Sequence, residues 1–282
     1  MIEFVKMHGA GNDYIFIDCL AKEPPEDPSR LARRMSDRHF GAGADGLVLI
    51  LPPENKENHC KMRIFNADGS EAENCGNAVR CLAKLVYERG EIVEKKMRLE
   101  TGAGVLCLEL NVRKAKVASV RVDMGLPRFS PSEIGVRLEG ERVIEHPLEL
   151  EDRLFKMTCI SMGNPHAVIF IDEPVEGFPV EHYGPLIEKH PLFPRRTNVE
   201  FVNIRGKQLL RQRTWERGSG ETLACGTGAS AAAVAAILTG HCSPGKVEVQ
   251  LNGGMLVIEW RQGENVFMTG PAEEVYTGCW PE

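Results

Sequence analysis

The chain contains an internal repeat, and this feature constrains its fold more than any other. A segment around Cys75 reads NADGSEAENCGNAVR, and a segment around Cys225 reads ERGSGETLACGTGAS. In both segments a glutamate stands four residues before the cysteine and a glycine follows it, at an offset of 150 residues. Self-similarity at one spacing is typical of a duplicated structural unit. We therefore expect two halves of similar architecture.

Further matches support the duplication because they occur in the same order at nearly the same spacing. The pairs are Asn12 with Asn164, Gly104 with Gly254 and Gly125 with Gly270, at offsets between 145 and 152 residues. The length of 282 residues also suits about two domains. We expect an N-terminal half over 1–130 and a C-terminal half over 150–270, leaving open whether the final strand or C-terminal tail crosses over. The seam is expected at 130–155, where the composition is charged and rich in turn-forming residues.

Each half repeats a pattern of short strands, a Gly-rich turn, the cysteine and a helix. Residues 76–89 have apolar side chains at helical spacing and stop at Gly90, and residues 226–239 carry no charge and stop at Gly240. A helix that is apolar all round is expected to be buried. Strands are predicted at 47–51, 105–110, 119–124, 166–171, 248–251 and 255–260. The pattern predicts an α/β (α+β) fold with two homologous halves, each a curved, mostly antiparallel sheet around a buried central helix.

Composition disfavours several classes of protein. Hydrophobic residues make up 43% of the chain and charged residues 26%, which is typical of a globular protein. The net charge of −6 gives no reason to expect nucleic acid as a partner. No run approaches the roughly 18 apolar residues of a membrane span, and the N-terminal residues turn polar before a signal peptide could form. We therefore expect a cytoplasmic protein with no membrane partner.

The cysteines do not suit a disulfide framework or a structural metal site. There are nine of them, an odd number, scattered along a long chain. No CxxC pair occurs, so we expect no zinc or other metal. Most of these thiols are expected to be small buried side chains, and the two repeat-related ones are the exceptions.

Cys75 and Cys225 both fall at the first turn of a predicted buried helix. Unpaired backbone N–H groups and the helix dipole favour negative charge there, so we expect a lowered thiol pKa at each position. The following glycines, Gly76 and Gly226, let a carboxylate approach the backbone. The simplest packing brings the two cysteines together across a cleft between the halves. Two equivalent acid–base groups facing one carbon suit racemisation or epimerisation, with one thiolate as base and one thiol as acid.

The sequence resembles the diaminopimelate epimerase family from end to end. The resemblance is carried by KMHGAGND, RHFGAGADG, RIFNADGSEAENCGNAVRC, SMGNPH, TNVEF, ERGSGETLACGTGASAA and MTGPA. It implies cofactor-independent epimerisation of LL-2,6-diaminopimelate to the meso form, in the biosynthesis of lysine and peptidoglycan precursors. It also implies that Cys75 and Cys225 are the catalytic thiols and that His166 and Glu216 help to set their ionisation. No lysine motif for pyridoxal phosphate is evident, so no cofactor is expected.

Substrate contacts are implied by the same motifs. They fall on Asn12, Asn66, Gly76, Asn77, Asn164, Asn198, Glu216, Arg217, Gly226 and Thr227. Arg217 suits the distal carboxylate because a guanidinium can bind it through two hydrogen bonds. This chain departs from some members, which have a glutamine where it has Gly46. At that position we expect at most a backbone contact with the substrate.

Two other functions remain open. A proline or hydroxyproline racemase also uses paired thiols, although the polar set around Glu216 and Arg217 argues against a cyclic apolar substrate. A redox protein would instead join Cys75 and Cys225 in a reversible disulfide. GAGADG at 41–46 matches a dinucleotide-binding motif literally, but it precedes a predicted strand instead of following one, so we expect no such cofactor. A homodimer is expected from base rates alone.

Overall fold

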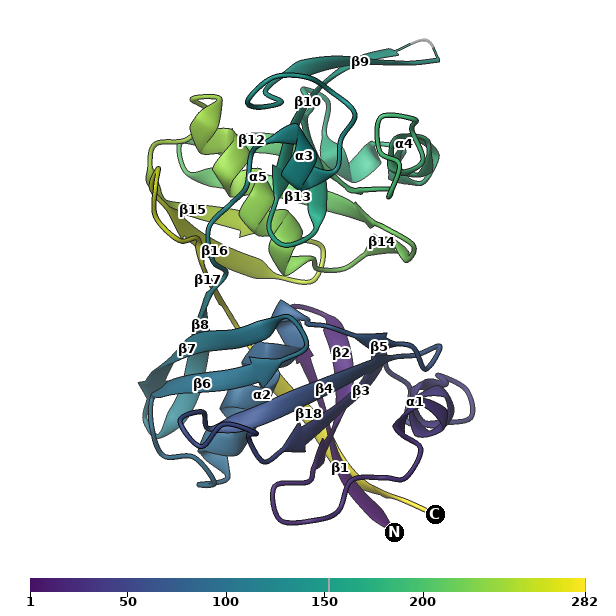
Figure 1. Ribbon diagram of the computed structural model, residues 1–282, viewed down its shortest axis with the longest axis vertical. Coiled ribbons are helices and arrows are strands. Elements are labelled where there is room, and N and C mark those ends of the chain that lie inside the picture. Colours follow the sequence, from purple (N-terminus) through teal and green to yellow (C-terminus); the bar gives the residue numbers. More distant parts are fainter. Residues whose placement is uncertain (152, 282) are drawn as a thin grey trace. The chain divides into compact units, whose positions relative to one another are not determined.

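A computed structural model describes residues 1–151 and 153–281. The chain divides into two compact units, one formed by Met1–Asp123 with Thr269–Glu282 and the other by Met124–Met268 (Figure 1). The first unit is therefore discontinuous in sequence, and the second is continuous. Part of the segment expected as a seam, 130–155, forms α3 (Pro131–Ile134) and β9 (His146–Leu150) within the second unit.

The first unit is built on a mixed sheet. Its strands are β1 (Ile2–Gly9), β2 (Asn12–Asp18), β3 (Gly46–Leu51), β4 (Cys60–Asn66), β5 (Glu71–Ala72), β6 (Lys96–Thr101), β7 (Gly104–Arg113), β8 (Lys116–Asp123) and β18 (Glu273–Trp280). They follow the order β18–β1–β2–β3–β4–β6–β7–β8. Neighbours are antiparallel except β2 with β3 and β4 with β6, and β5 pairs with the far end of β4. The last strand of the chain thus pairs with the first.

The second unit repeats this topology. Its strands are β9, β10 (Arg153–Ser161), β11 (Pro165–Phe170), β12 (Asn198–Gly206), β13 (Leu209–Glu216), β14 (Gly220–Thr222), β15 (Gly245–Gln250) and β16 (Met255–Trp260), and β17 (Phe267–Gly270) leads out of it. The order is β9–β10–β11–β12–β13–β15–β16, with β11–β12 and β13–β15 parallel. Thus β10 takes the place of β1, and β9 takes the place of β18. The expected α+β fold of two homologous halves is confirmed.

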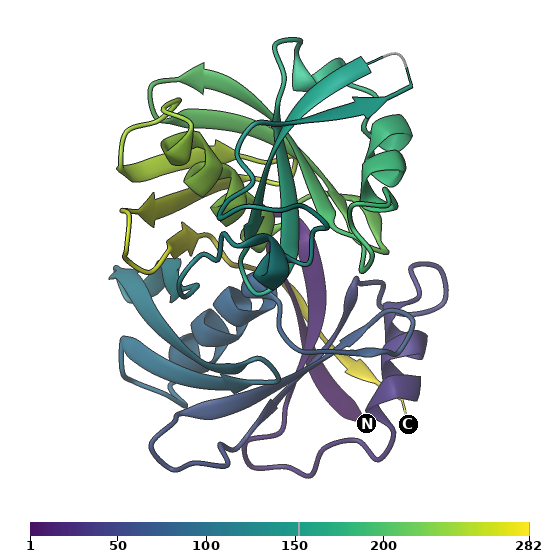
Figure 2. The same cartoon turned by 45° about the horizontal axis from the view of Figure 1, so that its top comes forward.

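A central helix lies against the inner face of each sheet: α2 (Gly76–Glu88) in the first unit and α5 (Gly226–Leu238) in the second (Figure 1, Figure 2). The helix α5 is rich in alanine and buried along most of its length, as its lack of charge predicts. The apolar positions predicted in α2, such as Val79 and Leu82, are also buried. Beyond α2, Gly90 adopts φ 76°, a left-handed conformation that ends the helix.

The outer face of each sheet is also covered. The helix α1 (Pro28–Ser36) packs on β3 and β4, and α4 (Val180–Glu188) packs on β12, β13 and β14. A short 3₁₀ helix, η1 (Val175–Gly177), adds to the second unit. The strand β3 runs parallel to β2 and is buried on both faces, and its sequence is accordingly a continuous apolar run. Burial on both faces fixes the positions of strands such as β3 and β12, which begin at the predicted site residues Gly46 and Asn198.

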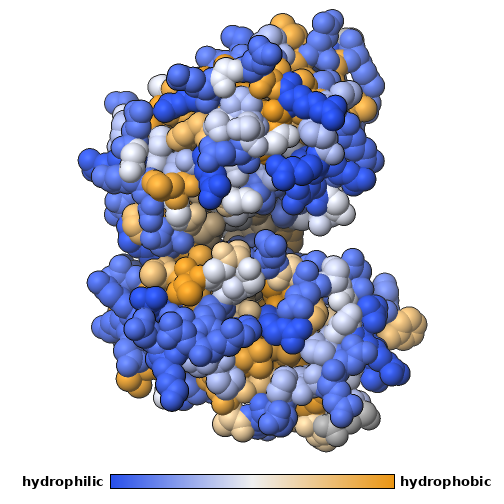
Figure 3. All heavy atoms as spheres, in the orientation of Figure 1, coloured by the Kyte–Doolittle hydropathy of each residue, from blue (hydrophilic) through white to orange (hydrophobic). Residues whose placement is uncertain are grey.

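Hydrophilic residues dominate the visible surface of each unit, with apolar side chains in small groups (Figure 3). Across residues 1–151 and 153–281, no helix is long and apolar enough to cross a membrane.

Candidate active site

Each of the two cysteines is the N-cap of its unit's central helix. Cys75 precedes α2 with φ −149° and ψ 114°, and Cys225 precedes α5 with φ −121° and ψ 108°. These extended conformations are usual at an N-cap. The glycines that begin the helices, Gly76 and Gly226, therefore lie directly beside the thiols. The same local geometry in both units is what the repeat predicts.

In the first unit, Cys75 lies within a chain of polar contacts. Its sulfur lies 3.4 Å from Asn12 Oδ1, and Asn77 Nδ2 donates to the same oxygen at 3.0 Å. Behind them, the buried Arg80 donates from Nη2 to Asn77 Oδ1 at 2.8 Å. The predicted residues Asn12 and Asn77 thus meet at Cys75. Arg80 places a buried cation behind this network, and sequence reasoning gave it no role.

The orientation of the Asn12 amide is fixed from its other side. Asn12 Nδ2 donates to Asp45 Oδ2 at 2.7 Å, and Asp45 in turn accepts from Arg38 Nη2 at 2.8 Å. Asn12 Oδ1 therefore faces Cys75. Asp45, to which the sequence analysis gives no role, thus positions a predicted site residue.

Tyr14 is a further residue near Cys75 to which the sequence analysis gives no role. It stands two residues after Asn12, as His166 stands two residues after Asn164, so the repeat could have singled it out. The side chain is buried, and this burial, followed by the neighbouring Cys75 sulfur, raises the pKa of Tyr14 well above its usual value. Tyr14 therefore stays a neutral phenol near the thiol.

Gly46 lies on β3 opposite Tyr14 and Asn66. A Cβ atom at Gly46 would lie 2.2 Å from the carbonyl oxygen of Phe65, so β3 and β4 leave no room for a side chain. A glutamine side chain at this position would not fit this backbone. Asn66 itself is exposed and donates from Nδ2 to Ser70 Oγ at 3.0 Å.

In the second unit, Cys225 contacts the first turn of its own helix. Its sulfur lies 3.5 Å from Thr227 Oγ1, and Asn164 Nδ2 donates to that hydroxyl at 3.3 Å. His166 is fully buried and makes two contacts, through Nε2 to Asn164 Oδ1 at 3.0 Å and through Nδ1 to Glu200 Oε1 at 2.8 Å. Three predicted residues thus connect to Cys225, together with Glu200, which was not predicted.

The remaining predicted residues lie at the ends of β12 and β13. Asn198 Oδ1 accepts from the backbone N–H of Arg217 at 2.9 Å, and Glu216 Oε1 accepts from Thr222 Oγ1 at 2.6 Å. Arg217 is exposed, and its Nη1 donates to the carbonyl of Arg195 at 3.3 Å. The guanidinium is thus accessible to a ligand carboxylate.

The ionisation of Cys225 differs from the sequence-based expectation. The residue is only 5% exposed, and this burial raises the pKa of its thiol well above the usual value. Glu216 and Glu200 raise the pKa further, whereas the Thr227 hydroxyl lowers it. The expected lowered pKa at this helix start is therefore wrong for Cys225, because burial outweighs the helix terminus.

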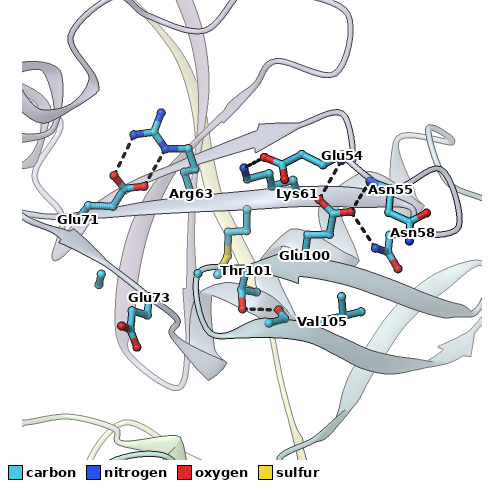
Figure 4. A pocket seen from close by; sticks show the side chains of 14 residues that line it. Glu54, Asn55, Asn58, Lys61, Arg63, Glu71, Glu73, Glu100, Thr101 and Val105 are labelled. Atoms are coloured by element: carbon cyan, nitrogen blue, oxygen red, sulfur yellow. Dashed lines mark hydrogen bonds and ion pairs between the residues drawn. The ribbon is translucent and has the colours of Figure 1, made fainter.

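A separate pocket of about 530 Å³ lies in the first unit and contains none of the predicted site residues. Four of its charged side chains form two ion pairs, which Figure 4 shows for Arg63 with Glu71 and for Lys61 with Glu54. Glu100 accepts from Asn58 Nδ2 at 2.8 Å in the same pocket. Because these groups are already partnered, we place the candidate site at the cysteines.

Known structures share the fold at low sequence identity. A hydroxyproline epimerase from Agrobacterium vitis, solved with bound trans-4-hydroxy-L-proline, superposes with a TM-score of 0.69 at 17% identity, covering 98% of this chain and 91% of that one. Together with the repeated cysteine sites and the relatives described next, this fold places the chain among the amino-acid racemases and epimerases.

Curated relatives are similar over almost their whole length. Diaminopimelate epimerase from Pelotomaculum thermopropionicum is 52% identical, with 99% of each chain covered, and that from Acetivibrio thermocellus is 51% identical, with 98% of each covered. The family model "Diaminopimelate epimerase" matches residues 4–130 and 158–275. The chain belongs to the diaminopimelate epimerase family.

Proposed function

We propose that this enzyme interconverts LL- and meso-2,6-diaminopimelate without a cofactor, using Cys75 and Cys225 as the two acid–base groups. The observation that carries this proposal is the repeat-related position of the two thiols, each at the N-terminus of a central helix and each in contact with polar side chains of its own unit. Membership of the family supports the substrate.

In the proposed reaction, one thiolate removes the α-proton and the other thiol donates a proton to the opposite face of the carbon. The raised pKa of Cys225 favours its protonated form, which suits Cys225 as the acid and leaves the role of base to Cys75. The reverse direction exchanges the roles. The backbone N–H groups at the helix starts would stabilise the negative charge that develops on the substrate carboxylate.

The distal end of the substrate is assigned to the second unit. The exposed Arg217 guanidinium would hold the distal carboxylate, and Glu216 and Asn198 would accept hydrogen bonds from the distal ammonium group. Proline has neither group at that end. We therefore prefer diaminopimelate to a cyclic imino acid.

The cellular setting is part of the same proposal. We propose a cytoplasmic enzyme of lysine and peptidoglycan precursor biosynthesis, which the family name supports. The odd number of cysteines suits a reducing compartment. A homodimer is proposed from the frequency of such assemblies among enzymes, and sedimentation analysis measures it directly.

The deciding experiment is proton NMR of LL-diaminopimelate in D₂O with reduced enzyme and no added cofactor. We expect loss of the α-proton signal and appearance of the meso form. Cys75→Ala and Cys225→Ala should each abolish epimerisation, whereas Cys107→Ala, which changes an exposed cysteine, should not. Turnover near that of the wild type in either catalytic variant would refute the two-thiol mechanism, and exchange with proline but not with diaminopimelate would refute the substrate.

A further inference from the structure

A layer of polar side chains is buried beneath the first turn of α5. His166, Glu200 and Gln212 are all completely buried, on the neighbouring strands β11, β12 and β13. Burial of such groups costs free energy unless they are paired. At Gly228 a Cβ atom would lie 2.6 Å from Glu200 Oε1, so the absence of a side chain there admits the glutamate. Glu200 is therefore buried at a cost in free energy, and the backbone at Gly228 makes room for it. We ask what this carboxyl group does.

Hydrogen bonds connect Glu200 to the Cys225 sulfur in four steps. Glu200 Oε1 contacts His166 Nδ1 at 2.8 Å, and His166 Nε2 contacts Asn164 Oδ1 at 3.0 Å. Asn164 Nδ2 then donates to Thr227 Oγ1 at 3.3 Å, and Thr227 Oγ1 lies 3.5 Å from Cys225 Sγ. The other oxygen of Glu200, Oε2, is buried with no hydrogen-bond partner in the described part of the chain. The carboxyl group is thus committed to His166.

The partners of His166 determine where its ring carries a proton. Asn164 Oδ1 only accepts hydrogen bonds, so His166 Nε2 must carry a hydrogen. Glu200 is compatible with a hydrogen on Nε2 whether the proton shared between Glu200 and His166 lies on the carboxyl group or on the ring. A carboxylate accepts from Nδ1–H of an imidazolium, and a carboxylic acid donates to Nδ1 of a neutral ring. Without Glu200, Nδ1 would have no partner, so a ring protonated only on Nδ1 could form together with a flipped Asn164 amide that donates from Nδ2 to Nε2.

We propose that Glu200 is a positioning residue that holds the proton on His166 Nε2 and thereby fixes the Asn164 amide. Its Nδ2 then occupies one lone pair of the Thr227 hydroxyl, whose hydrogen is left to donate to Cys225. This hydrogen bond favours the thiolate form, which burial opposes and which the reverse reaction needs. The inference rests on the proposed function of Cys225.

The corresponding positions of the first unit, all within the described residues, carry no histidine–glutamate pair. In the strand register, Tyr14 lies opposite Gly46, just as His166 lies opposite Asn198. Two residues further along, Val48 therefore occupies the position that corresponds to Glu200. Neither Tyr14 nor Val48 can supply an ionisable pair of this kind. The two thiols therefore have different polar support.

The test compares Glu200→Leu with Glu200→Gln. Leucine removes every polar contact to His166 Nδ1, whereas the glutamine amide can still donate to Nδ1 and keep the Nε2 proton. Long-range ¹H–¹⁵N NMR of ¹⁵N-histidine-labelled protein reports the tautomer, with His166→Gln used to assign its signal among the 8 histidines. We expect Nε2–H in the wild type and in Glu200→Gln, and a shift towards Nδ1–H in Glu200→Leu.

Kinetics provides the second readout. In Glu200→Leu, kcat should fall about tenfold with KM almost unchanged, since one hydrogen bond to a charged group is lost. For the reverse reaction, in which Cys225 is the base, the acidic limb of the kcat/KM profile should move to higher pH. The ionisable groups around the Cys225 sulfur are Glu216 and Glu200, with His166 behind Asn164. The control Thr214→Val alters the same buried layer through Gln212 without touching the relay and should change neither readout.

Each outcome decides the inference. An unchanged tautomer in Glu200→Leu would overturn it, as would a Glu200→Gln variant as impaired as Glu200→Leu. Because the tautomer is measured on the protein without substrate, this result does not depend on which substrate the enzyme uses. If the wild type failed to epimerise diaminopimelate, the proposed function would fall while the NMR comparison still tested the role of Glu200 in the relay.

Discussion

Arg213 and Glu221 form a two-pronged ion pair between β13 and β14, with Nε–Oε1 and Nη2–Oε2 distances of 2.6 and 2.7 Å. The repeat reproduces it 150 residues earlier, where Arg63 and Glu71 lie 2.7 and 2.9 Å apart. The two pairs differ in burial: side chains are 16% and 18% exposed in the second unit but 37% and 46% in the first. The repeat thus provides a matched experiment on one interaction in two environments.

We expect Glu221→Gln to reduce the free energy of unfolding more than Glu71→Gln does. Arg213 also donates to the carbonyls of Val175 and Phe178, so it stays in place as a poorly hydrated cation when its partner is lost. The loss should be about 2–3 kcal/mol for Glu221→Gln and under about 1 kcal/mol for Glu71→Gln. Urea unfolding of both variants measures this, and equal losses would contradict the burial argument.

The two cysteines proposed as acid–base groups should differ in their reaction with iodoacetamide near pH 8. Cys75 is half-buried, whereas Cys225 is buried and its thiol pKa is raised well above the usual value. We expect Cys75 to be alkylated first, as read by peptide mass spectrometry. Cys159 is the internal control, because burial raises the pKa of its thiol to about 12 and it should stay unmodified. Equal rates at Cys75 and Cys225 would show that burial does not protect the second thiol.

Glu100 should make stability depend on pH. The Asn58 amide, followed by the backbone N–H groups of Glu54 and Asn55, lowers the pKa of Glu100 in the folded protein. Its contribution is therefore complete above the unfolded-state pKa of about 4.3 and is lost as the pH falls through the folded-state pKa. The difference in Tm between the wild type and Glu100→Gln should shrink from pH 7 to pH 3. A difference that stays constant over this range would exclude this carboxylate as the cause.

Gly46 should tolerate no side chain. Gly46→Ala would place a Cβ atom 2.2 Å from the Phe65 carbonyl oxygen, so β3 and β4 must separate, at a cost of about 1–3 kcal/mol. The matched control is Gly177→Ala, where no atom lies within 4 Å of the added Cβ. Thermal unfolding compares the two variants. If Gly46→Ala were as stable as the control, this strand pair would have room for a Cβ atom at position 46, against the short distance to the Phe65 carbonyl oxygen.

Much of the fold was predictable because it depends on local pattern and on the repeat. The uncharged run of α5 required burial, and Gly90 and Gly240 marked where the central helices end. The burial of Arg80 was not predictable, because a charged residue in a helix is usually expected to face solvent. Its partners include the carbonyl of Pro271, which only the folded chain brings near.

The contacts around the two cysteines were predictable where residue types repeat and less so where they change. Asn12 and Asn164 are the same residue type, and each belongs to the polar contacts around its unit's cysteine. Tyr14 and His166 do not resemble each other, so the tyrosine was missed. Glu200 stands in the apolar run of β12, where sequence alone gives it no partner. Only the parallel register of β11 with β12 brings it to His166. The pKa of Cys225 likewise depends on packing that no motif encodes.

The return of β18 to the first unit sets an order on the assembly of the protein during synthesis. Residues 124–268 are contiguous and carry every strand of their own sheet, including the edge strand β9 beside β10. The first unit has no such independence, because β18, which pairs with the edge of β1 that faces away from β2, is encoded after the whole second unit. On the ribosome, the half that is translated first therefore waits with an unpaired strand edge until the half that is translated second has been made.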